Sequence, residues 1–219
     1  MDCRLLGFFS GFPNHRFPHD VAKRLSEDLT HRSSLVFVSA WPEDYERNDR
    51  DSTGMHGMFE EYNIPFAQHF VIDNRMEASY ATQLIHEASC VFLMGGHPGL
   101  QLQLIHDKDL DFVICDTDAV VLGVSAGAIN MAVNSLDTKE SPVPYNGLGL
   151  ADITVKPHFE PENQCIMSSL LQISMNFPIC AMEDDSAIFV AGDRISSTGE
   201  IHWIHQGKIC PLWQGGLVP

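Results

Sequence analysis

The chain has 219 residues, of which 44% are hydrophobic and 19% are charged, and its formal net charge is −16. This length and composition are typical of one globular domain, which we take to span residues 1–219. The negative charge argues against nucleic acid and anionic membrane surfaces as partners, because both would repel the protein.

Hydropathy and cysteine spacing indicate the cellular compartment of the protein. No apolar stretch approaches the roughly 20 residues that span a bilayer, and the apolar run 5–12 lacks the flanks of a signal peptide. The six cysteines form no Cys-x-x-Cys pair, and Cys90 and Cys115 lie beside apolar runs, as buried thiols do. We therefore expect a cytoplasmic protein with reduced thiols and with neither metal nor cofactor.

Buried strands alternate with helices through the first 125 residues. Continuous apolar runs predict strands at 5–10, 34–40, 66–72, 89–94 and 120–124. Amphipathic or helix-compatible segments predict helices at 20–29, 52–62, 76–88, 99–105 and 112–118. This alternation is typical of an α/β fold, a mostly parallel sheet with helices on both faces.

The pattern changes after residue 150. Short strands are predicted at 153–156, 179–182, 187–191 and 201–204, and one helix at 165–175. We expect the last two of these strands to pair as a small antiparallel hairpin near the end of the chain.

The most informative stretch is Gly123-Val124-Ser125-Ala126-Gly127, which follows an apolar strand directly and leads into small, helix-compatible residues. This arrangement is typical of a nucleophile elbow, in which a serine sits in a strained turn between strand and helix. Because parallel sheets place their sites at the carboxyl ends of the strands, the turn 95–99 after the preceding strand is expected nearby.

A serine nucleophile requires a base and a group that orients the base. His158 follows the predicted strand 153–156 and is therefore expected at the same sheet edge as Ser125. The residues alone leave the acid open among Asp137, Glu140, Asp152 and the run 183–185.

Several motifs together resemble the S51 serine peptidases, the family of aspartyl dipeptidase (peptidase E) and cyanophycinase. The matching pieces, in chain order, are Gly95-Gly96, the elbow 123–128, Leu148-Gly149-Leu150, Pro157-His158-Phe159 and 183–187. The resemblance runs over nearly the whole chain. It implies a three-layer αβα sandwich similar to the class I glutamine amidotransferases, with serine in place of their cysteine.

The resemblance also implies roles for individual residues. Ser125 would be the nucleophile and His158 the general base. The family's acid precedes a proline by two residues, which selects Glu140, two residues before Pro142, with Asp137 as the alternative. The oxyanion hole would be formed by the amides of Gly95, Gly96 and Ala126.

Two departures from the family pattern affect the expected substrate. His97-Pro98 follows the two glycines, and proline removes one amide donor there. No arginine lies between Ser125 and Arg194, whereas the aspartyl dipeptidases bind an acidic side chain with arginines in that region. We therefore expect no strict demand for aspartate. The substrate-binding residues expected are His97, Lys156 and Asp185, with Arg47 or Arg50 as alternative cations.

The resulting prediction is a serine-type hydrolase of small peptides, similar to a dipeptidase; a homodimer is left open. Two alternatives stay open, a non-catalytic binding protein on an amidotransferase-like fold and a small esterase with the same elbow. A metal site at 183–185 is disfavoured, because adjacent residues of a strand-like segment point to opposite faces.

Overall fold

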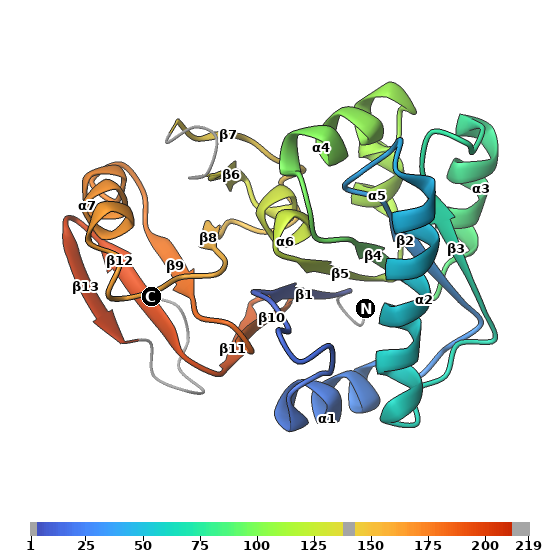
Figure 1. Cartoon of the computed structure of the whole chain (residues 1–219), viewed down its shortest axis with the longest axis horizontal. Coiled ribbons are helices and arrows are strands. Elements are labelled where there is room, and N and C mark those ends of the chain that lie inside the picture. Colours follow the sequence, from blue (N-terminus) through green and yellow to red (C-terminus); the bar gives the residue numbers. More distant parts are fainter. Residues whose placement is uncertain (1–3, 138–142, 212–219) are drawn as a thin grey trace.

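A seven-stranded sheet forms the centre of the structure, a computed structural model that describes residues 4–137 and 143–211 (Figure 1). Its strands are β1 (Leu5–Phe9), β2 (Ser34–Val38), β3 (Gln68–Ile72), β4 (Cys90–Leu93), β5 (Val120–Val124), β10 (Ala187–Ala191) and β11 (Arg194–Thr198). They lie in the order β11-β10-β1-β5-β4-β2-β3. The neighbouring strands β1, β5, β4, β2 and β3 run parallel to one another. Strand β10 pairs with β1, and β11 with β10, in antiparallel orientation. The predicted α/β class with a mostly parallel sheet is confirmed.

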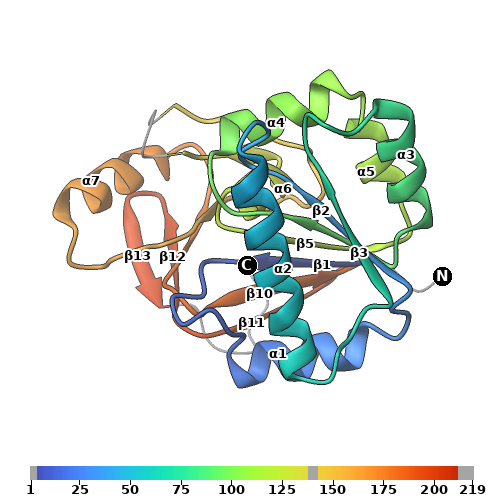
Figure 2. The ribbon, with the colours of Figure 1, turned by 45° about the vertical axis from the view of Figure 1, so that its right-hand side comes forward.

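Helices cover both faces of this sheet (Figures 1 and 2). One face packs against α1 (His19–Asp28) and α2 (Tyr45–Glu61), and the other against α3 (Ala78–Glu87), α4 (Pro98–Asp107), α5 (Asp111–Asp116) and α6 (Ala126–Met131). Strand β2 shows why both faces need cover. Leu35 and Phe37 join the core beneath α1 and α2, whereas Val36 and Val38 join the opposite core. An unbroken apolar run therefore forms a strand buried on both sides.

A second sheet lies beside the first, on the left of Figure 1. It contains β8 (Val155–Lys156), β9 (Ile179–Met182), β12 (Ile201–His205) and β13 (Lys208–Pro211) in the order β13-β12-β9-β8, and α7 (Gln164–Ile173) packs on it. A short pair, β6 (Asn134–Ser135) with β7 (Tyr145–Asn146), lies apart from it. Because β8 and β9 are parallel neighbours, the residues that follow them emerge side by side.

The predicted hairpin between 187–191 and 201–204 is wrong. Strand β10 pairs instead with β11 through a two-residue turn that contains Gly192, and β12 pairs with β13 through Gln206-Gly207. Gln206 and Gly207 both have positive φ, of 50° and 70°, as a tight hairpin turn requires. The polar sequence of 194–198 hid the strand that separates the two predicted partners.

Helix α2 begins at Tyr45, seven residues before the predicted start. Its first two turns carry mainly charged and polar side chains, so they lack the apolar periodicity on which the prediction relied. The helix begins there because the Asp44 carboxylate accepts a hydrogen bond from the Arg47 backbone N–H and caps the amino terminus.

Two observations bear on the expected surroundings of the protein. No helix in the described part of the chain is both long and apolar enough to cross a membrane. The five cysteines within that part are free thiols.

Candidate active site

Ser125 occupies the sharp turn between β5 and α6. Its backbone has φ +52° and ψ −109°, a conformation that costs a residue with a side chain about 1–3 kcal/mol. The adjacent glycines allow this turn to lie against its neighbours. A Cβ at Gly127 would lie only 2.1 Å from the Leu93 carbonyl oxygen, and one at Gly123 only 2.6 Å from the Gly127 carbonyl carbon. The two glycines of the motif are therefore required by packing.

His158 and Asp184 continue from Ser125 as a chain of hydrogen bonds. The Ser125 Oγ atom lies 2.9 Å from His158 Nε2, and His158 Nδ1 lies 2.7 Å from Asp184 Oδ1. His158 follows β8 through Pro157, and Asp184 follows β9 through Glu183. The parallel pairing of β8 and β9 thus brings the imidazole and the carboxylate together.

The carboxylate on His158 Nδ1 is not the one that the sequence prediction selected. Asp184 occupies the position that was assigned to Glu140, and Glu140 itself lies outside the described residues. Asp137, the alternative, lines the cavity beside Ser125. The physical reason for the difference is the β8–β9 pairing, which the sequence pattern does not reveal.

The end of β1 holds all three segments of the site. The Phe9 carbonyl oxygen accepts the Ser125 N–H at 2.9 Å, Ser10 Oγ accepts the His158 N–H at 2.8 Å, and the Gly11 carbonyl accepts the Asp185 N–H at 2.8 Å. Ser125, His158 and Asp185 all have positive φ, of 52°, 51° and 62°. Three consecutive residues at the buried end of β1 therefore hold the three strained backbone positions of the site in place.

Ser10 also joins the His158 loop to the strand that precedes Asp184. Its hydroxyl is fully buried and donates to the Met182 carbonyl at 2.9 Å while accepting from His158. Met182 ends β9, two residues before Asp184. One hydroxyl thus fixes the His158 loop against the Asp184 turn.

A cavity of about 200 Å³ opens on Ser125 and His158. Its wall is formed by Trp41, the 96–98 turn, the start of α6 and the segment before His158. The lining residues are Trp41, Gly96, His97, Pro98, Ser125, Ala126, Ile129, Leu136, Asp137, Lys156, Pro157 and His158. Gly95 lies directly behind this wall, since a Cβ there would be 3.6 Å from the Ser125 Cβ. The cavity therefore unites the serine, the imidazole and the glycine turn.

The His97-Pro98 pair, which departs from the expected family pattern, has a structural role. Pro98 is the first residue of α4, where a missing N–H costs nothing, and the His97 Nδ1 atom accepts a hydrogen bond from the Leu100 N–H at 3.2 Å. Gly96 before it has φ +146°, so a glycine is needed there. The pair thus starts a helix beside the cavity.

The predicted substrate-binding residues divide into two groups. His97 and Lys156 line the cavity, but Lys156 is buried and its ammonium donates to the Pro157 carbonyl. Asp185 does not line this cavity, and burial, with the nearby Asp184 charge, raises the pKa of its carboxyl. Within residues 4–137 and 143–211, no group of three or more His, Cys, Asp or Glu side chains could hold a metal ion.

The arginines considered as alternative cations lie elsewhere. Arg47 pairs with Asp51 at 3.2 Å and stacks over the Trp41 ring, and Arg50 also pairs with Asp51. Neither lines the cavity at Ser125.

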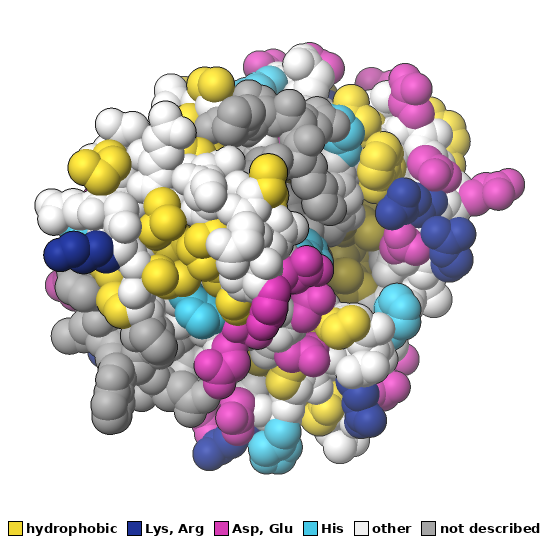
Figure 3. Space-filling view, turned by 60° about the vertical axis from the view of Figure 1, so that its left-hand side comes forward, with side chains coloured by type: hydrophobic (Ala, Val, Ile, Leu, Met, Phe, Trp, Pro, Cys, Tyr) yellow, Lys and Arg dark blue, Asp and Glu magenta, His cyan; other side chains and the backbone are white. Residues whose placement is uncertain are grey.

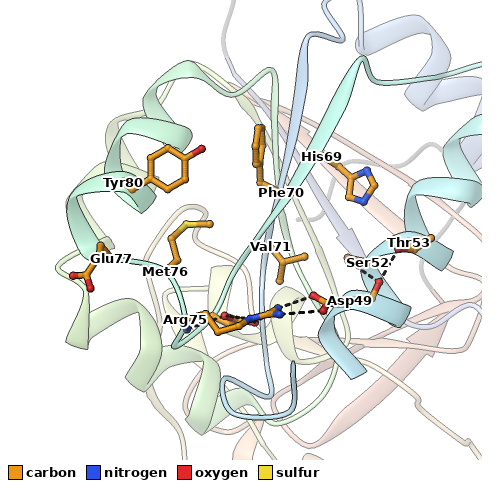
Figure 4. A pocket seen from close by; sticks show the side chains of 11 residues that line it. Asp49, Ser52, Thr53, His69, Phe70, Val71, Arg75, Met76, Glu77 and Tyr80 are labelled. Carbon is orange, nitrogen blue, oxygen red and sulfur yellow. Dashed lines mark hydrogen bonds and ion pairs between the residues drawn. The ribbon is translucent and has the colours of Figure 1, made fainter. Parts of the chain in front are cut away.

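A larger hollow of about 670 Å³ lies between α2, β3 and α3, away from Ser125 (Figure 4). Arg75 lies in its wall, and its guanidinium is hydrogen-bonded to both Asp49 and Asp73. These bonds raise the arginine's pKa further above its ordinary value. Ser125 and His158 line the smaller cavity and not this hollow, so size alone does not select the site.

Comparison with known proteins identifies the family of this chain. The model of peptidase family S51 matches residues 19–198, which is most of the chain. The chain belongs to peptidase family S51. The predictions of this family and of a serine-type peptidase are confirmed, and no curated protein matches the sequence.

Solved structures similar to this S51 chain show the same fold at low identity. A peptidase from an acI-B1 actinobacterium superposes with a TM-score of 0.78 at 16% identity, covering 98% of this chain and 96% of that one. A peptidase E-like protein from Listeria monocytogenes EGD-e gives a TM-score of 0.66 at 16% identity, covering 90% and 98%. At such identity these likenesses establish the fold alone.

Gly11, which sequence reasoning passed over as a strand end, provides a prediction for this S51 peptidase. An alanine Cβ there would lie 2.3 Å from His158 Cε1 and 2.6 Å from Asp184 Oδ1, so the ring or the carboxylate must move. We expect Gly11→Ala to lower kcat/KM for a peptide substrate by about 100-fold, because small displacements of catalytic groups have effects of that order.

The matched control is Gly54→Ala, since nothing lies within 4 Å of a Cβ at that helical position. This variant should keep full activity and be more stable by about 0.5–1 kcal/mol, as Gly→Ala in a helix usually is. Wild-type kcat/KM in Gly11→Ala would show that His158 is not seated against the end of β1.

Proposed function

We propose that this S51 chain hydrolyses small peptides, in the manner of a dipeptidase, with Ser125 as nucleophile, His158 as general base and Asp184 as the acid that orients the base. The observation that carries this proposal is the unbroken sequence of contacts from Ser125 Oγ through His158 to Asp184, at 2.9 and 2.7 Å. Both distances lie in the range that proton transfer and orientation require.

The geometry supports a definite division of labour. Asp184 accepts the Nδ1–H, so Nε2 is left unprotonated and faces the Ser125 hydroxyl. His158 takes the hydroxyl proton as Ser125 Oγ attacks the peptide carbonyl, and then gives that proton to the departing amine. A water molecule then attacks the acyl group on Ser125. His158 takes the proton of that water and returns it to Ser125 Oγ as the acid product leaves.

The developing oxyanion needs hydrogen-bond donors beside Ser125. We assign this role to the backbone amides of Gly95, Gly96 and Ala126. The position of these residues supports the assignment, since Gly96 and Ala126 line the cavity and Gly95 lies against the Ser125 side chain. Amides fixed in a turn and at a helix start stabilise such charge because they need not reorganise during the reaction.

Cavity size and charge support a small substrate that need not be acidic. A volume of about 200 Å³ is below the range of about 300–1,000 Å³ that is usual for drug-sized ligands. No arginine of the described segments lines it, and its lysine, Lys156, is buried against a backbone carbonyl. One face of the molecule also carries a band of Asp and Glu side chains, with Lys and Arg towards its margins (Figure 3).

Dipeptide selectivity tests this proposal. We expect hydrolysis of Ala-Leu and Lys-Leu with a kcat/KM within about tenfold of that for Asp-Leu, because a buried P1 carboxylate without a paired cation would cost several kcal/mol. The measurement is kcat/KM for the three dipeptides at moderate salt, beside short acyl esters.

Two results would contradict the proposal in different ways. A hundredfold preference for Asp-Leu, about 2.7 kcal/mol in transition-state binding, would require a cation in the cavity that pairs with the P1 carboxylate. Hydrolysis of the esters with no dipeptide cleaved would make the enzyme an esterase.

A further inference from the structure

Trp41 separates the Ser125 cavity from a second, larger one. The neighbouring cavity has a volume of about 610 Å³ and lies over Pro42, Asp44, Leu100 and Gln103. Of all the residues that line these two cavities, Trp41 alone is common to both. The indole therefore forms the partition between a small catalytic space and a space about three times as large.

A buried network fixes the backbone of Trp41. Its N–H donates to Ser39 Oγ at 2.9 Å, and its carbonyl accepts from Asn48 Nδ2 at 3.0 Å. Ser39 and Asn48 also bond to each other at 2.7 Å, and Asn48 donates to Asp73 at 3.1 Å. All three partners are buried, so the network resists movement of the partition.

The indole ring is held on several sides as well. The Arg47 guanidinium lies over it at 4.8 Å, and the His97 ring meets it edge-on at 5.8 Å. Its Nε1 atom is packed so closely against Gly96 that a Cβ there would be 2.4 Å away. This N–H is buried without a hydrogen-bond partner in the described part of the chain, which is unfavourable for a polar group. The ring therefore stays in place at the expense of an unsatisfied donor.

From this geometry we infer that Trp41 is the residue that restricts this enzyme to short peptides. The inference rests on the proposed function at Ser125 and adds to it the residue that determines substrate length. With the indole in place, a peptide bound at Ser125 is confined to the cavity of about 200 Å³. Without it, the two cavities join and a longer peptide can extend over Leu100 and Gln103.

The test compares Ala-Leu with the extended peptides Ala-Ala-Ala-Leu and Ala-Leu-Ala-Ala in the wild type, Trp41→Ala and Trp41→Phe. The wild type should cleave the extended peptides at least tenfold less efficiently than Ala-Leu, since steric exclusion in a pocket readily gives such factors. Trp41→Ala should raise kcat/KM for an extended peptide relative to Ala-Leu by about tenfold or more. Trp41→Phe keeps the aromatic partition and removes the N–H, so it should leave the ratio within about threefold.

Trp41→Leu serves as a second truncation if the alanine variant does not fold. The same ratios are measured as binding by calorimetry in a Ser125→Ala background, where no turnover occurs. An unchanged ratio in both truncations, or equal cleavage of all three peptides by the wild type, would overturn the role of Trp41 and leave the proposed function standing. If none of the peptides is cleaved and none binds, both proposals fail.

Discussion

Replacing Ser125 by alanine is expected to lower kcat/KM for dipeptides by about 10³-fold or more, because nucleophile, base and acid act as a unit. The fold should survive. The substitution removes one hydroxyl, and the strained turn is held by the Ser125 N–H bond to Phe9 and by the flanking glycines, which remain. The measurement is dipeptide hydrolysis together with covalent labelling by a fluorophosphonate probe, which the wild type should take up and the variant should not.

Ser168→Ala is the matched control. Ser168 is exposed on α7, its hydroxyl donates to the Gln164 carbonyl within the helix, and it does not line the cavity at Ser125. It should keep wild-type hydrolysis and labelling. Full activity in Ser125→Ala would end the assignment of this serine as nucleophile, and a wild type that the probe does not label would favour a non-catalytic binding protein.

Asp184→Asn is expected to lower kcat by about 10³-fold with little change in KM, because an amide cannot hold the His158 tautomer that leaves Nε2 free to accept the serine proton. The volume and the position of the side chain barely change, so the variant should fold as the wild type does. The measurement is the separation of kcat from KM for Ala-Leu, with the melting temperature as a check on folding.

Glu140→Gln tests the alternative acid, and Asp185→Asn is the control at the residue next to Asp184. Because Asp184 occupies the hydrogen-bonding position on Nδ1, both variants should retain kcat within about threefold. A loss confined to Glu140→Gln, with Asp184→Asn nearly unaffected, would restore the assignment made from the family resemblance.

Local patterns identified most of the first half of the fold. Each of the five parallel strands was predicted to within two residues at either end, because strands buried on both faces are continuous apolar runs. The errors arose where the sequence is polar. The start of α2 and most of β11 consist of polar residues, so their structure is set by a cap and by pairing with β10 rather than by hydrophobic periodicity.

The sequence by itself determined which serine lies in the turn and which histidine meets it. The expected shared sheet edge was wrong, because β8, which precedes His158, belongs to the second sheet and not to the sheet of β5. Ser125 and His158 each follow a strand within a recognisable local motif, and local motifs survive in a linear pattern. The tertiary structure decided which carboxylate contacts His158, since Asp184 reaches the ring through the pairing of β8 with β9, which lie 23 residues or more apart. It also decided that Gly11 and Trp41 belong to the site. Their roles depend on what lies against them in space, and spacing along the chain carries no record of such contacts.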